Sequence, residues 1–255
     1  MVNDQNRLPS IDEGELWAEQ QLKPDLELHL VGLKNALHIL SITIEAVPPM
    51  NLDQVSSSKK IATALLVKIA NDLRAIAILT SKGYAIQAAT IAASLYEFAF
   101  MIAYIGDDED LANKWIEHSD LTHNIVSIKE MTLNALKKLG APNPEEECEK
   151  EYKVYKDLCM IKHGNPNFQK AHSFIIENNS VIASPGPMTT DEFIKVSWYT
   201  IENAVSLARI ALGSFINHQL KTNATDEIIN KYNDLKNLYN HLNSLGFNKY
   251  GDSSR

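Results

Sequence analysis

Residues 84–105 have the sequence YAIQAATIAASLYEFAFMIAYI, twenty-two positions with a single charged side chain, Glu97. A helix that is apolar on every side either packs at the centre of a protein or spans a membrane. Much of this apolar content is alanine, and a carboxylate near the middle of a span costs roughly 2.5–3.5 kcal/mol. We therefore predict a buried central helix, with a membrane span as the alternative.

On both sides of this segment, apolar residues recur at intervals of three and four, the spacing of amphipathic helices. Ser10 with Glu13, and Thr189 with Glu192, have the spacing of helix-starting capping boxes. Proline and glycine mark the expected ends, such as Pro24 after the first short helix. The expected helices span residues 10–22, 25–47, 56–83, 84–105, 109–139, 144–163, 189–221 and 225–246.

The predicted fold is all-α, an antiparallel bundle of six to seven helices with residues 84–105 at its centre. Helical periodicity is lost after residue 165, and two β-branched runs flank Asn178-Asn179, so a small β-hairpin is expected near residues 173–184. The predicted organisation is an N-terminal arm with a short helix (1–23), a single bundle domain (24–246) and a flexible tail (247–255).

Composition narrows the class of partner. Apolar residues make up 45% and charged residues 22%, which is enough apolar material for a globular core. The net charge of −8 disfavours RNA as a partner, although RNA stays possible if basic groups gather locally. The N-terminus shows no secretory pattern. We therefore expect a cytoplasmic protein with no membrane partner, which pairs as a homodimer or with another protein.

Whole classes of chemistry lack their motifs in this chain. The sequence contains no phosphate-binding glycine loop, no dinucleotide fingerprint, no Cys-x-x-Cys and no His-Glu-x-x-His. Cys148 and Cys159 fall on one expected helix, about 16 Å apart along its axis and out of disulfide reach. We predict no cofactor and no metal.

Arg74 and Glu97 are the two charges set in the most apolar pair of neighbouring helices. A short turn at Lys82-Gly83 makes those helices antiparallel, which permits an ion pair between the two side chains. One interpretation is structural, a pair that neutralises two buried charges and fixes the helix register. The other is a site in which the guanidinium binds an anionic ligand.

His163 lies four residues beyond Cys159, at the expected end of a helix whose dipole favours a protonated ring. With Lys162 and Asn165 it forms a polar cluster that could bind an anion, and His163 itself could act as a general acid or base. A histidine that simply caps the helix is the alternative. The candidate catalytic residues are His163, Arg74 and Glu97, and the candidate ligand-binding residues are Arg74, Glu97, Lys162, His163 and Asn165.

Several short motifs between residues 61 and 165 resemble a family of bacterial helical proteins known only as a domain of unknown function. They are Leu73-Arg74, Gly83-Tyr84, Ala88-Ala89, Ser94-Leu95-Tyr96-Glu97, Asp110-Leu111-Ala112 with Trp115, and Tyr155-x-x-Leu158-Cys159-x-x-x-His163. The resemblance implies a helical fold and a recurring polar trio, with no agreed activity.

That family is similar in outline to HEPN bundles, many of which are metal-independent ribonucleases with an Arg four to six residues before a His. Here the window before His163 holds Lys156 and no Arg, and Arg209 precedes His218 by nine. We expect a non-catalytic interaction or regulatory module that binds a small anion or a partner in a bacterial stress or phage-defence setting. The alternative is a HEPN-like ribonuclease with His163 as general acid/base.

Overall fold

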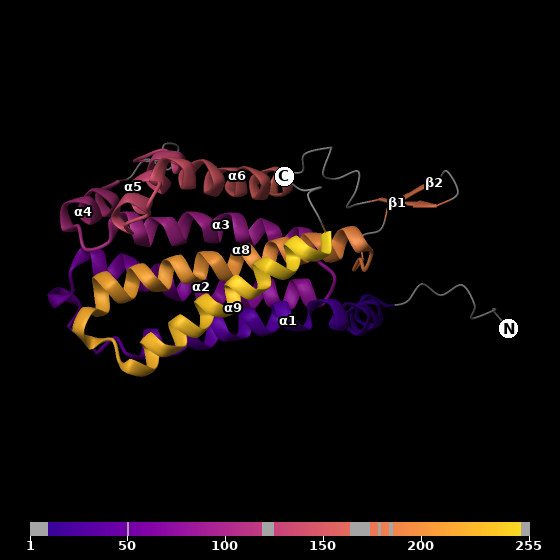
Figure 1. Ribbon diagram of the computed structural model, residues 1–255, viewed down its shortest axis with the longest axis horizontal. Helices are drawn as coiled ribbons and strands as arrows, with labels where there is room; N and C mark the ends of the chain where they lie inside the picture. The colour runs from indigo at the N-terminus through magenta and orange to yellow at the C-terminus, as the bar shows by residue number, and fades with distance from the viewer. Residues whose placement is uncertain are drawn as a thin grey trace.

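A computed structural model describes residues 10–49, 51–118, 125–163, 174–177, 180–183 and 186–250. Eight α-helices lie in these ranges, so the all-α class is confirmed and the count of six to seven predicted for the bundle is too low. They are α1 (Ile11–Glu45), α2 (Ser57–Ser81), α3 (Ala85–Ile105), α4 (Glu109–Glu117), α5 (Ile128–Lys138), α6 (Pro144–Lys162), α8 (Asp191–Phe215) and α9 (Asp226–Tyr250) (Figure 1). Three single-turn helices complete them: η2 (Leu52–Gln54), η3 (Ile216–Leu220, a π-helix) and η4 (Lys221–Asn223).

The central position predicted for residues 84–105 is confirmed. Helix α3 lies between α6 and α8 and also packs against α2 and α5 (Figure 1). Small side chains on α3 let these neighbours approach closely, because an alanine places only a methyl group between two backbones. The fully buried alanines of α3 are Ala85, Ala88, Ala89, Ala92, Ala93, Ala99 and Ala103.

Helix α3 is also, among the described residues, the one helix long and apolar enough to cross a membrane. Its most apolar window is 61% buried by the other helices. A core helix passes the same length and composition test, so the test is weak evidence for a span.

The N-terminal prediction of two helices separated at Pro24 is wrong. The capping box at Ser10 and Glu13 forms, but α1 then continues through Pro24 to Glu45. Proline removes one hydrogen bond within a helix, and packing can outweigh that loss. Here Ala18 and Leu22 are buried before the proline and Leu26 after it, against Trp198 of α8. Residues 10–23 are thus part of a core helix.

The single helix predicted for residues 109–139 is divided into α4 and α5. Asp108 caps α4, where its carboxylate accepts from the backbone N–H of Leu111. Ser127 caps α5 in the same way, accepting from Glu130 N–H. A Ser followed three residues later by Glu is a helix-start signature, so Ser127 and Glu130 indicate a second helix start within residues 109–139.

The strands β1 (Phe174–Glu177) and β2 (Ser180–Ala183) pair antiparallel, with Phe174 opposite Ala183. Helix α8 begins after Thr190, whose side chain makes no capping bond, so the capping box predicted at Thr189 is wrong. Of the two predicted starts of the last helix, Asn223 and Thr225, the second is confirmed: α9 begins at Asp226, and Thr225 accepts from Ile228 N–H. It extends to Tyr250, four residues beyond the predicted end at Gly246.

Candidate functional site

The predicted convergence of Arg74, Glu97 and His163 does not form as hydrogen bonds or ion pairs within the described residues. Arg74 is exposed on α2 and has no ionic partner there. The position of Glu97 along the helix axes explains why. The α2 residue that lies beside this part of α3 is Lys68, whose ammonium group is 5.2 Å from the ring centroid of Phe98, the neighbour of Glu97. Arg74 is six residues nearer the turn, about 9 Å along the helix axis.

His163 occupies the C-cap of α6 and is exposed, as is Lys162. Its backbone N–H donates to the Cys159 carbonyl at 2.9 Å, which satisfies one of the free carbonyls at the helix end. This is the geometry of the capping interpretation. Asn165 lies outside the described residues. No group of three or more potential metal ligands occurs in the part of the chain that the structure describes.

Glu97 instead pairs with α6. The Tyr155 hydroxyl donates to Glu97 Oε1 at 3.0 Å, and the Tyr155 ring lies 5.0 Å from the ring of Tyr96. Burial raises the pKa of Tyr155, and the Cys159 thiol and the negative charge of Glu97 raise it further. The phenol therefore stays protonated and serves as a hydrogen-bond donor to the carboxylate.

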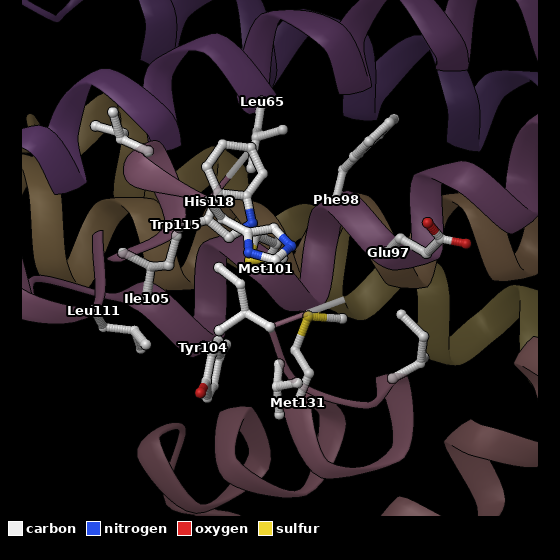
Figure 2. A pocket seen from close by; sticks show the side chains of 14 residues that line it. Leu65, Glu97, Phe98, Met101, Tyr104, Ile105, Leu111, Trp115, His118 and Met131 are labelled. Carbon is white, nitrogen blue, oxygen red and sulfur yellow. The ribbon is translucent and has the colours of Figure 1, made fainter. Parts of the chain in front are cut away.

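Next to Glu97, residues of α2, α3, α4 and α5 line an open cavity of about 560 Å³. Most of its lining side chains are apolar, and Glu97 and His118 are the ionisable ones besides the Tyr104 phenol (Figure 2). The lining residues are Leu65, Glu97, Phe98, Met101, Tyr104, Ile105, Leu111, Trp115, Ile116, His118, Ile125, Val126, Ile128 and Met131.

The cavity follows one face of α3. Its α3 residues are at positions 97, 98, 101, 104 and 105, which is the one-face spacing of a helix and covers about 12 Å of its axis. Glu97 lies at one end of the view and Leu111 at the other, with the His118 ring between them (Figure 2). The lining is thus elongated, with Glu97 at one end and apolar side chains at the other.

Comparison with known proteins gives a match over part of the chain. Residues 59–174, 116 of the 255, match a family model. This segment matches DUF5677, a family of unknown function. The predicted resemblance to a family of unknown function is therefore confirmed over this segment, and the HEPN-like kinship stays a prediction. The chain matches no curated protein and no solved structure.

The DUF5677 match contains all the lining residues of the cavity, together with Tyr155. Helices α1, α8 and α9 lie outside the match and supply much of the core that holds α3 in place. The cavity therefore lies within the matched segment, and the remaining helices support α3 from outside it.

Several polar pairs outside the cavity were not anticipated. In the core, His29 Nε2 lies 3.1 Å from Glu202 Oε1, and the His29 ring stacks on Trp198. These partners are 173 residues apart, and no local spacing could have linked them. No sequence spacing indicated the cavity either, because its lining residues come from four helices and from the connection after α4.

Proposed function

We propose that the protein is a non-catalytic helical binding module, and that it takes a small, largely apolar molecule into the cavity between α2, α3, α4 and α5. The observation that carries this proposal is the cavity itself. Its volume of about 560 Å³ falls within the usual range of small-molecule sites, roughly 300–1,000 Å³. Such sites combine an apolar lining with a few polar groups, as here.

The ligand differs from the small anion expected from sequence. Arg74 and Lys162 are exposed and line no part of the cavity, whereas Glu97 does. A carboxylate repels an anion in a site of low dielectric constant. The geometry therefore favours a neutral or cationic ligand over an anionic one.

The rim of the cavity carries exposed apolar surface. Trp115 is 38% exposed, Ile116 53% and Ile125 38%, and all three contribute to the lining. Contiguous exposed apolar side chains are unfavourable in water and mark surfaces that a ligand or partner covers. A bound apolar molecule would shield this rim, which supports a binding role.

A neutral probe tests this function. We expect octanol to bind the full-length protein, measured by calorimetry and as a rise in melting temperature, because a ligand that binds only the folded state stabilises it. Met101→Trp fills the cavity with a larger side chain and should abolish the response. Met160→Trp makes the same change at an exposed position of α6 and should leave it intact.

Leu65→Phe, which narrows the cavity from α2, provides a second variant in case Met101→Trp fails to fold. It should weaken octanol binding. Absence of octanol binding to the wild-type chain, or equal binding by wild type, Met101→Trp and Leu65→Phe, would overturn the proposed function.

A further inference from the structure

Resting on the proposed function, we infer that the cavity selects cationic amphiphiles: molecules with an amine at one end and an unbranched apolar body. The amine would bind Glu97, and the body would lie along α3 toward Ile105 and Leu111 (Figure 2). This assigns a ligand class and an orientation to the site.

The first argument is the unused bonding capacity of Glu97. An ionised carboxylate has about four acceptor positions. The structure shows one hydrogen bond to this carboxylate, from Tyr155 to Oε1. No Lys, Arg or His in the described ranges pairs with it, and Lys68, the cation nearest in level, is bonded to Asp72 of its own helix. A ligand ammonium group could supply the missing donors.

The second argument is the location of that charge. Glu97 is half-buried at the end of an apolar cavity, where fewer waters screen it than at the surface. A charge-assisted hydrogen bond is roughly twice as strong as a neutral one. Among ligands of equal length, the site should therefore prefer an amine to an alcohol, and an alcohol to a carboxylate.

The third argument is aromatic. The Phe98 and Tyr104 rings line the cavity, and both already lie near lysine ammonium groups, at 5.2 Å from Lys68 and 5.9 Å from Lys138. These distances are within the range of cation–π attraction. Of these two rings, Phe98 is the one next to Glu97, so the wall at that end includes a side chain that already lies close to a positive charge.

Three probes of equal chain length test the inference: octylamine, octanol and octanoate. An eight-carbon chain is comparable in length to the α3 face of the cavity. We expect calorimetry at neutral pH to show octylamine binding about tenfold more tightly than octanol, with octanoate weakest. In Glu97→Gln, the preference for the amine should disappear while octanol binds as before.

Two further variants keep the result interpretable. Glu117→Gln removes the same charge from an exposed position outside the cavity lining and should keep the amine preference. Tyr155→Phe frees the bonded oxygen of Glu97 and should increase octylamine affinity. If Glu97→Gln fails to fold, the octylamine affinity of Tyr155→Phe decides the test.

The outcomes separate the inference from the function on which it rests. Equal binding of all three probes, or tightest binding of octanoate, would overturn the inference and leave the cavity a ligand site. An amine preference that survives in Glu97→Gln would also overturn it, because the charge would then act from elsewhere. Binding of none of the probes would overturn both.

Discussion

Glu109 connects two helices through backbone groups. Its carboxylate accepts from Ser57 N–H at 2.8 Å and Ser58 N–H at 3.2 Å, two donors in the first turn of α2 that have no partner within their own helix. Burial alone would raise the pKa of Glu109, but these bonds and those from the Ser56 and Ser58 side chains outweigh it, and the pKa is lowered. Glu109 of α4 therefore acts as a cap for another helix.

Glu109→Gln should lower the free energy of unfolding by about 1 kcal/mol at pH 7, the usual cost of losing a cap. A carboxyl group with a lowered folded-state pKa stabilises the fold above its unfolded value of about 4.3, and this contribution is lost as pH falls through the folded-state pKa. The difference between wild type and variant should therefore shrink below about pH 4. Denaturant titrations at pH 7, 5 and 3.5 measure it.

Asp110→Asn is the matched control for this measurement. It removes a charge from the next, exposed residue of the same helix turn and leaves the α2 bonds intact. A pH-independent difference for Glu109→Gln, or an equal loss in Asp110→Asn, would contradict the capping role.

At the same scale, the sequence located one member of the candidate site and misassigned its partner. A lone charge in an apolar helix had to be half-buried or paired, and Glu97 is both. Arg74 was predicted as the partner because its distance before the Lys82-Gly83 turn is comparable to that of Glu97 after it. Counting residues from a turn places two side chains relative to each other only to within one or two helical turns. Tyr155 lies 58 residues away, and its approach depends on how α6 packs against α3.

At the scale of the element, Pro24 shows where local rules failed. Proline is a reliable stop signal only when nothing holds the chain on both sides of it. Buried Leu22 and Leu26 hold α1 on both sides, and the Trp198 indole N–H donates to the Asp25 carbonyl at 2.8 Å. Helix existence and type followed from periodicity almost throughout, whereas boundaries depended on such tertiary contacts.

Pro24→Ala should raise the free energy of unfolding by about 1–2 kcal/mol. Alanine restores a helical N–H donor at an exposed position and has a higher helix propensity, and this gain is partly offset by a more flexible unfolded chain. Chemical denaturation monitored by circular dichroism measures the change. Pro144→Ala, at the first turn of α6 where proline is favoured, should give no gain. Destabilisation by Pro24→Ala would show that the proline sets the position of Trp198.

At the scale of the whole molecule, the all-α class and central α3 could be predicted because they follow from the apolar content and length of single segments. The cavity could not, because it is the space left by four helices with different axes. The breaks between α3, α4 and α5 place two short helices, α4 and α5, around one face of α3, and a continuous helix over residues 109–139 would have left no such space.

Net charge disfavours the remaining alternative, the HEPN-like ribonuclease. RNA binding depends on neutralising phosphates with clustered Lys and Arg, and this chain carries 24 basic against 32 acidic residues. His163 is exposed at the end of α6. Of the predicted basic ligand-binding residues that the structure describes, Lys162 is the one beside it. We therefore expect total RNA to stay intact when incubated with micromolar protein in the absence of divalent metal.

Gel analysis of wild type, His163→Ala and His38→Ala checks this expectation, since His38 is an equally exposed histidine on α1. Cleavage lost in His163→Ala and kept in His38→Ala would establish the ribonuclease and displace the non-catalytic proposal. Cleavage equal in all three would indicate a contaminating nuclease, because the same trace activity would accompany every preparation. Intact RNA, together with octanol binding that Met101→Trp abolishes, would place the function in the cavity, because a phosphate backbone and an apolar chain require opposite surroundings.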